Sequence, residues 1–413
     1  TGEVHKTYSA ADLWKSLCQA TWECGDPGVQ YHDTINKWHT CPNTGPINAS
    51  NPCSEFVFLD DTACNLASLN LTKFVSENGS FEIEKFCQAV KIFILAQEIL
   101  VDMSSYPTKK IAENSHKFRP LGLGYANLGT LFLRWGIAYG SDEARMLAGA
   151  ITALMTGYAY QVSSELADDM GAFAGNHENV EPFSAVMRLH ADFLDNLMSP
   201  SIAPINTSSA LLSNFNNISE YAYVAWRKVL GANKFRNSQV TLLAPTGTIG
   251  LLMDCDTTGV EPVYSHKVLK NLAGGGQITM VNESLEAGLK ALGLNVDELA
   301  DYYQRNGTFV GSSMPVAALP VFDTASVDKA GRTIHWSDHL KMMSAVQPFL
   351  SGAISKTVNM PFTATVENIS DAYRMGHDLG LKAVAVYRDG CKAVQPLQTE
   401  ASKPRTGVAV QEK

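Results

Sequence analysis

The sequence predicts an α/β fold, in the form of a single layered barrel rather than two domains. Stretches with helical periodicity alternate with short apolar stretches through most of the chain, which is typical of strands covered by helices. A chain of 413 residues with 45% apolar content can also bury a sizeable core. We find no internal repeat of fixed period, which argues against a solenoid or propeller.

Three helices are predicted from their start signals and apolar stripes. Ser9 can cap the first helix, a second is expected over residues 82–103, and Ser141 can open a third that extends to Met170. Acidic residues in the first turn of the third helix suit the helix dipole. The positions expected to face the core are Leu13, Leu17 and Trp22 in the first helix, and Phe86, Val90, Ile94 and Ile99 in the second.

Four short apolar segments are predicted to be buried strands: 56–59, 239–243, 357–360 and 383–387. A helix from about Ile369 precedes the last of them. From residue 392 the sequence becomes polar and contains proline, so residues 1–391 are expected to form the folded part and 392–413 a mobile tail without chemistry.

Charge and hydropathy exclude several classes of partner. A net charge of −9 provides no basic surface for nucleic acid, although a small nucleotide could be held by local groups. The longest apolar run, 90–101, is interrupted by polar residues and is shorter than the roughly 20 residues of a membrane span. We therefore expect neither a nucleic-acid partner nor a membrane segment.

The start of the chain and its cysteines indicate a cytoplasmic fragment. The sequence opens Thr1-Gly2-Glu3 without an initiator methionine or a signal peptide, so we expect a piece of a longer protein. Eight cysteines without secretory spacing suit a reducing cytoplasm. No CxxC pair or Cys/His cluster suggests a metal site.

The segment Asn51-Pro52-Cys53-Ser54-Glu55 places an amide, a thiol and a carboxylate at alternate positions. In extended backbone these three side chains would project to one side, where a base, a sulfur reactant and an orienting amide could act on one bound molecule. The alternative is that Cys53 is a small buried hydrophobe, which is the more common place for a lone cysteine.

The wider stretch NASNPCSEFVFLDDTACNLASLNL, residues 48–71, closely resembles the finger loop and following strand of ribonucleotide reductases. The resemblance implies that Cys53 becomes a thiyl radical that abstracts the 3′-hydrogen of the substrate ribose. It implies that Glu55 deprotonates the 3′-hydroxyl and that Asn51 binds the sugar. Cys64, eleven positions after Cys53, would be one member of the cysteine pair that is oxidised to a disulfide, and its partner would lie on an earlier strand outside this chain.

A second motif, APTGTIG at residues 244–250, follows a predicted strand and can open a helix. Its backbone N–H groups and hydroxyls could hold a phosphate, although such a turn is more often simple capping. Together with DTTGVEP, which follows it, the motif resembles the substrate-phosphate loop of the same family. The resemblance implies that Thr246, Gly247 and Thr248 contact phosphate.

RPLGLGYANLGTLF from Arg119, SKTVNMP from Ser355 and GLKAVAVYRDG from Gly380 extend the resemblance over roughly residues 1–397. It implies the second half of a ten-stranded α/β barrel with an inserted finger loop, the N-terminal half of the barrel being absent from this chain. It also implies a ribonucleoside di- or triphosphate substrate and a thioredoxin-like or other dithiol reductant.

The resemblance also indicates the radical source. Iron-dependent members carry two adjacent tyrosines on the last strand, where this sequence has Ala385 and Val386, which cannot be oxidised. This feature and the spacing of Cys53 and Cys64 favour adenosylcobalamin as the cofactor. The alternatives are the large subunit of an iron-dependent reductase and a catalytically silent nucleotide-binding fragment.

Overall fold

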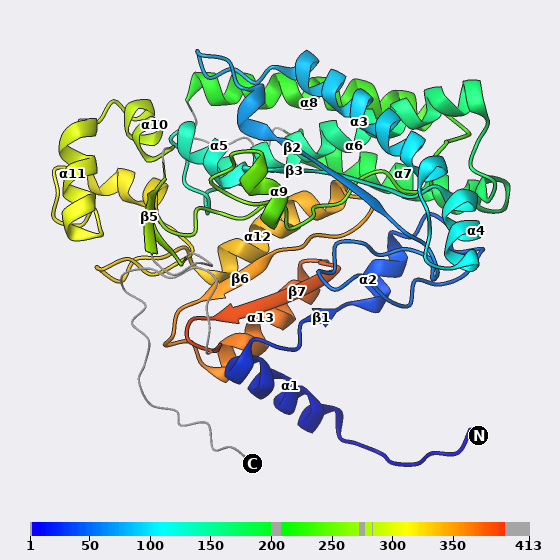
Figure 1. Ribbon diagram of the computed structural model, residues 1–413, viewed down its shortest axis with the longest axis horizontal. Helices are drawn as coiled ribbons and strands as arrows, with labels where there is room; N and C mark the ends of the chain where they lie inside the picture. Colours follow the sequence, from blue (N-terminus) through cyan, green and yellow to red (C-terminus); the bar gives the residue numbers. More distant parts are fainter. Residues whose placement is uncertain (1, 200–207, 272–276, 283, 393–413) are drawn as a thin grey trace.

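The computed structural model describes residues 2–199, 208–271, 277–282 and 284–392 (Figure 1). The α-helices are α1 (Ala10–Cys24), α2 (His32–Lys37), α3 (Ile83–Met103), α4 (Lys109–Phe118), α5 (Leu128–Arg134), α6 (Asp142–Met170), α7 (Asn176–Leu197), α8 (Ser209–Gly231), α9 (Gly247–Leu252), α10 (Ser284–Ala291), α11 (Val296–Asn306), α12 (Trp336–Val346) and α13 (Val366–Asp378). Short 3-10 helices span Leu71–Phe74, Val316–Phe322 and Gln347–Phe349. The strands are β1 (Val29–Gln30), β2 (Asn65–Asn70), β3 (Leu121–Ala126), β4 (Lys267–Asn271), β5 (Gln277–Val281), β6 (Thr357–Met360) and β7 (Ala383–Arg388).

Backbone pairing forms one path of parallel segments through the centre of the molecule. β2 pairs in parallel with β3, and parallel bridges at Leu123–Thr241 and Leu243–Ile354 continue the pairing through 239–243 to the segment that leads into β6. β6 pairs in parallel with β7, whose other edge is covered by antiparallel β1. Mixed helix and strand content around this layer agrees with the α/β prediction.

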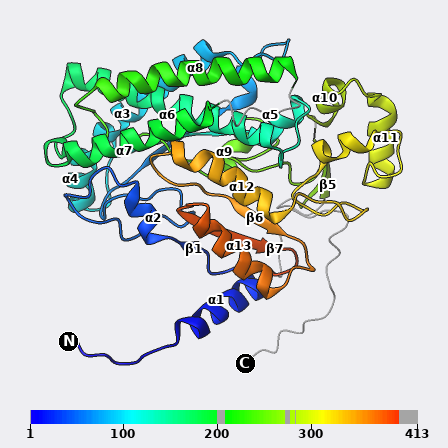
Figure 2. The same cartoon turned by 180° about the vertical axis from the view of Figure 1, so that it is seen from behind.

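Two groups of helices pack against the layer. α3, α6, α7 and α8 lie together on one side in Figure 1, where α6 and α8 are packed along each other. α12 and α13 contact β6 and β7, and α1 packs on α13, as the reverse view also shows (Figure 2). α10 and α11 form a lobe at one end with its own apolar cluster, which includes Leu289, Leu299 and Phe322.

Two glycines let β3 lie close to its neighbours. A Cβ atom at Gly124 would stand 2.4 Å from the carbonyl oxygen of Leu242, and one at Gly122 would stand 2.5 Å from Sγ of Cys64. Every residue of β3 is buried, so there is no room for the backbone to move away. Glycine is required here because any side chain would push β3 from the strand segment 239–243.

The predicted strands are confirmed in part. The segments 357–360 and 383–387 are β6 and the start of β7. The segment 239–243 makes only isolated parallel bridges. The prediction of a strand at 56–59 is wrong, since in this segment only Val57 makes a β-bridge, to Ser50. The reason is that the chain returns there from a tight turn.

The predicted helix starts are confirmed. The Ser9 side chain accepts a hydrogen bond from the Asp12 amide, and the Ser141 side chain accepts one from Ala144. The last helix, α13, begins at Val366, three residues before the expected start, since Thr365 and Asn368 form a capping box there. The tail prediction for 392–413 lies outside the described residues except for Lys392. None of the described helices combines the length and apolarity that a membrane crossing would require.

The apolar stripe of α3 is correct at Phe86, Val90 and Ile94 but wrong at Ile99, which is 54% exposed. At this end of the helix Gln97 and Glu98 are buried instead. The reason is a buried polar cluster that an apolar pattern does not reveal.

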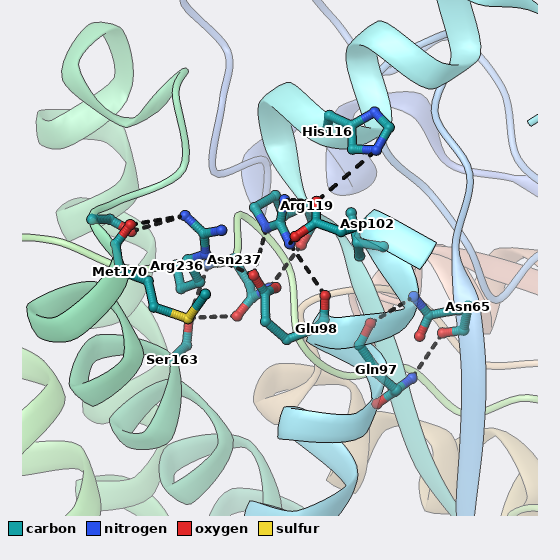
Figure 3. Close-up of polar contacts among 12 residues, drawn as sticks. Asn65, Gln97, Glu98, Asp102, His116, Arg119, Ser163, Met170, Arg236 and Asn237 are labelled. Carbon is teal, nitrogen blue, oxygen red and sulfur yellow. Dashed lines mark hydrogen bonds and ion pairs between the residues drawn. The ribbon is translucent and has the colours of Figure 1, made fainter. Parts of the chain in front are cut away.

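The Glu98 cluster consists of Glu98, Asp102, Arg119, Arg236 and Asn237 (Figure 3). Glu98 Oε1 accepts hydrogen bonds from Nε of both arginines at 2.6 Å, and Oε2 accepts one from Asn237 at 2.6 Å. Asp102 pairs with both terminal nitrogens of Arg119 at 2.7 and 2.8 Å.

The cluster joins the amino ends of adjacent parallel segments. Arg119 lies two residues before β3, and Arg236 and Asn237 lie just before segment 239–243. Gln97 exchanges backbone and side-chain hydrogen bonds with Asn65, the first residue of β2, at 2.8 and 3.2 Å (Figure 3). The end of α3 therefore aligns the starts of β2, β3 and 239–243.

Glu98→Gln is expected to lower the free energy of unfolding by about 3–5 kcal/mol, because it leaves buried arginine charge without compensation. The matched control is Glu113→Gln, which breaks an exposed pair with Lys109 at 3.5 Å and should change stability by at most about 0.5 kcal/mol. Denaturant unfolding of both variants measures the difference. Equal stabilities would show that the cluster does not hold the strand ends.

Candidate active site

Cys53 lies at the corner of a tight turn. The Ser54 amide donates to the carbonyl of Asn51 at 3.0 Å, and Ser54 has a positive φ of 65°. The expectation of extended backbone from Asn51 to Glu55 is therefore wrong. The physical reason is Pro52, whose fixed φ favours the second position of a turn that asparagine commonly opens.

The turn is closed and anchored by its neighbours. Asn51 Oδ1 accepts a hydrogen bond from the Phe56 amide at 3.0 Å, and the Asn51 amide donates to the carbonyl of Phe56 at 3.2 Å. Gln30 of β1 donates to the hydroxyls of Ser50 and Ser54 at 2.5 and 3.0 Å. Val57, which follows the turn, belongs to a small apolar cluster with Ile35, Ile47 and Ala353.

Glu55 is buried beside this turn. Its residue is only 2% exposed, and its carbonyl accepts a hydrogen bond from the Ala353 amide at 2.8 Å. Its carboxylate atom Oε2 has no hydrogen-bond partner among the described residues. A buried carboxylate oxygen without a donor is costly, so Oε2 is a candidate to accept a hydrogen bond from a bound molecule.

The negative charge of Glu55 affects the pKa of two free thiols, Cys53 and Cys64. The pKa of the exposed Cys53 thiol is raised, first by partial burial and then by the negative charge of Glu55. Burial and, to a smaller extent, Glu55 also raise the pKa of Cys64 well above its usual range. Cys64 directly precedes β2, and its Sγ packs against Gly122. The structure thus places two of the predicted cysteines within electrostatic reach of the predicted carboxylate of Glu55.

The predicted phosphate loop lies at the carboxyl end of segment 239–243. Thr246 precedes α9 with a φ of 50°, and its hydroxyl accepts a hydrogen bond from the Gly259 amide at 2.6 Å. Thr246 is buried, whereas Gly247 and Thr248 are exposed. Among the described residues, no hydrogen bond joins this loop to the Cys53 turn, so a bound molecule would have to connect them.

A buried ionic group fixes the stretch that follows the loop. Glu261 accepts hydrogen bonds from Lys356 Nζ at 2.5 Å and from the Thr357 amide at 2.7 Å, and Lys356 Nζ also lies 2.8 Å from His339 Nδ1. The motifs DTTGVEP and SKTVNMP indicated only the family resemblance, and the sequence assigned no contact to Glu261, Lys356 or His339. The signal that could have indicated them is Lys356, a lysine that directly precedes a short apolar strand.

A cavity of about 500 Å³ opens at the carboxyl ends of β6 and β7. It lies between these ends and the segment around Tyr264 and Asp328. Its lining is aromatic and polar and includes Tyr264, Ser326, Asp328, Asn359, Phe362, Tyr387 and Asp389. The lining named among the described residues has no lysine or arginine, so the cavity favours an uncharged ligand group over a phosphate. Within the described ranges, no three His, Cys, Asp or Glu side chains gather as a metal site would require.

Two free thiols within electrostatic reach of a buried carboxylate form a candidate site for thiol chemistry. The family model for the ribonucleotide reductase barrel domain matches residues 1–387. The chain therefore belongs to the ribonucleotide reductase family and represents its barrel domain.

Relatives support the family assignment. The chain is 50% identical over 407 residues to a vitamin B12-dependent ribonucleotide reductase of Rhodopirellula baltica, with 97% of this chain and 38% of that protein covered. It is 44% identical over 411 residues to the Streptomyces avermitilis protein of the same name, covering 97% of this chain and 41% of that protein. A vitamin B12-dependent ribonucleoside-diphosphate reductase of Mycobacterium tuberculosis is 30% identical over 405 residues, covering 98% of this chain and 50% of that protein. The chain thus spans half or less of the length of these relatives.

Glu55→Gln is expected to lower the pKa of Cys53 and of Cys64, because it removes a negative charge that disfavours both thiolates. Iodoacetamide alkylation of Cys53, measured by mass spectrometry across pH, should show its midpoint at lower pH. Cys255, whose raised pKa of about 11 comes from burial and from Asp256 and Asp254, serves as the internal control and should not move. An unchanged midpoint at Cys53 would mean that the carboxylate does not act on this thiol.

Proposed function

We propose that this chain supplies the catalytic part of a vitamin B12-dependent ribonucleotide reductase that reduces ribonucleoside di- or triphosphates to deoxyribonucleotides. The observation that carries the proposal is the buried Glu55 carboxylate, whose Oε2 lacks a partner among the described residues and whose charge reaches both Cys53 and Cys64. A ribose hydroxyl placed between these groups would give Oε2 the donor that it lacks.

In the proposed reaction a thiyl radical on Cys53 takes the 3′-hydrogen of the ribose. Glu55 accepts the proton of the 3′-hydroxyl, and the 2′-hydroxyl leaves as water. The Asn51 side chain uses Oδ1 for the Phe56 amide, which leaves its Nδ2 group to donate to a sugar oxygen. The exposed corner position of Cys53 lets its sulfur reach the sugar.

Loss of the hydroxyl requires two electrons. Cys64 and a second thiol supply them when they lose two protons and form a disulfide, and the 3′-hydrogen is then returned to the sugar from Cys53. A thioredoxin-like or other dithiol would reduce the disulfide for the next cycle. Cys64 suits the reductant role because burial keeps it protonated until the radical has formed.

The substrate phosphates would bind at the start of α9. Gly247 and Thr248 are exposed there and can present backbone N–H groups and a hydroxyl to phosphate oxygens. The Thr246 hydroxyl is engaged with Gly259, so Thr246 would contribute its backbone and the shape of the loop.

The fold also has a finer interpretation. We infer that the path of parallel segments from β2 to β7 is the second half of a ten-stranded α/β barrel, and that the Cys53 turn is the tip of its finger loop. The first half would come from a longer protein, which is consistent with relatives at least twice as long as this chain.

Adenosylcobalamin is the proposed cofactor, and when bound it supplies an organic radical through homolysis of its cobalt–carbon bond. The cavity at β6 and β7 would accommodate its adenosyl group, because aromatic side chains suit the base and the carboxylates and amide of the lining suit its amino and hydroxyl donors. Asn359 and Tyr387, which are register partners, would hold that group from the strand side. Ala385 and Val386 offer no oxidisable side chain for a radical relayed from a second protein.

The full-length reductase is expected to reduce nucleotide with adenosylcobalamin and a dithiol, without a second radical-bearing protein. Cys53→Ser should abolish turnover and leave substrate binding unchanged, since the O–H bond of serine is too strong to yield the radical. Product analysis and equilibrium binding measure the two effects. Activity that requires an iron- or manganese-bearing protein would contradict the cofactor proposal, and deoxynucleotide formation by the variant would contradict the role of Cys53.

Thr248→Val is expected to weaken substrate binding by about 1.5–3 kcal/mol, because it removes a hydroxyl donor to a charged phosphate at similar volume. Thr7→Val, at an exposed position before α1, is the control for the same substitution away from the loop. Isothermal titration with the substrate nucleotide compares the two variants. Equal affinities would move the phosphate site away from α9.

A further inference from the structure

Lys382 is a buried cation that the proposed reaction does not use. It directly precedes β7 and is only 1% exposed. In the described part of the chain it forms no ion pair with a carboxylate. Burial of an amine without a counter-charge is costly, so the other contacts of this amine must stabilise it.

The amine of Lys382 is surrounded by three consecutive carbonyl groups. Nζ donates to the oxygens of Leu350, Ser351 and Gly352 at 3.3, 3.0 and 2.6 Å. Trp38 covers the group from another side, with its ring centre 5.7 Å from Nζ. The Lys382 side chain therefore holds the turn 350–352 together by binding its three carbonyl groups.

This turn touches Glu55 directly. The amide of Ala353, the next residue, donates to the carbonyl of Glu55 at 2.8 Å. A Cβ atom at Gly352 would stand 2.9 Å from the same oxygen, so the two backbones are in close contact. The Gly352 amide donates to Thr241 at 2.8 Å, which ties the turn to the strand layer on its other side.

We propose that Lys382 is a positioning residue for Glu55: by holding the turn 350–352 against the strand layer, it fixes the backbone that carries the reacting carboxylate. The proposal rests on the proposed function of Glu55. It assigns Lys382 no contact with substrate.

The titration of Lys382 provides a signature of this coupling. Burial lowers its pKa to about 7, and the titratable side chains that interact with its charge are His39, from the loop after α2, and His190, from α7. Burial lowers the pKa of these histidines to about 4 and about 3, so both are neutral near pH 7. Above pH 7 the neutral amine still has two N–H groups for its two shortest contacts.

Opening of the turn would hydrate Lys382 and restore its ordinary pKa of 10.5. Between pH 7 and 10.5 the opened state thus binds a proton that the closed state lacks, so opening becomes less favourable as pH rises. Below pH 7 both states are protonated and this dependence ends.

The test combines Lys382→Met with the control Lys109→Met, which makes the same change at an exposed lysine. In the full-length reductase, Lys382→Met should lower kcat about tenfold or more with KM nearly unchanged, because Glu55 moves while the phosphate loop does not. In this chain, hydrogen exchange of peptides spanning 350–355 should accelerate at the Ala353 amide. Lys109→Met should change neither quantity.

The unaltered chain gives a second measurement that does not depend on the variant folding. After correction for intrinsic exchange, protection of the Ala353 amide should rise with pH above 7, and this rise should be absent in Lys382→Met. Protection independent of pH in the unaltered chain, or a variant with unchanged kcat and exchange, would overturn the proposal. If the unaltered protein has no reductase activity, the proposed function is refuted. The hydrogen-exchange result does not depend on that activity.

Discussion

The buried carboxylate of Glu98 is the interaction on which the alignment of the strands depends. It pairs with Arg119 and Arg236, which precede two adjacent parallel segments, and its neighbour Gln97 holds the start of β2. Each of these charged groups would be unpaired inside the protein if the segments slipped, so the cost of slippage is several kcal/mol, roughly that of breaking a buried pair. Because Cys64 directly precedes Asn65, the same alignment places the thiol against Gly122.

The site combines this rigid layer with loops that are fixed by polar contacts. Cys53 and Glu55 belong to a turn anchored through Gln30 and Ala353, while the stretch after the phosphate loop is fixed by Glu261 and Lys356. A nucleotide that bridges the two regions would meet groups whose positions are set independently. Such preorganisation limits the reorganisation needed during the reaction.

The sequence predicted those parts of the fold in which a local sequence pattern is sufficient to define the element. Ser9 and Ser141 were recognised as caps, and β6 and β7 as buried apolar runs. Periodicity failed at Ile99, because it counts apolar residues and cannot anticipate that Glu98 is buried with two arginines from distant segments. The extended interpretation of Asn51 to Glu55 failed because the fixed φ of Pro52 favours a turn, which the alternation of side chains does not reveal. The site residues came from a motif, whereas their mutual approach depends on long-range pairing that no local pattern encodes.

The contrast among glutamates supports Glu55 as the proposed base. Glu98 and Glu261 each accept hydrogen bonds through both carboxylate oxygens from cations and amides, so their charge is already stabilised. Glu55 is as buried as Glu98, and yet its Oε2 has no donor among the described residues, although Lys382 lies just beyond the adjoining turn. A direct ion pair with that lysine would satisfy the carboxylate and make it a weaker base. By binding backbone carbonyls instead, Lys382 can stabilise the position of Glu55 and leave the carboxylate available to a sugar hydroxyl.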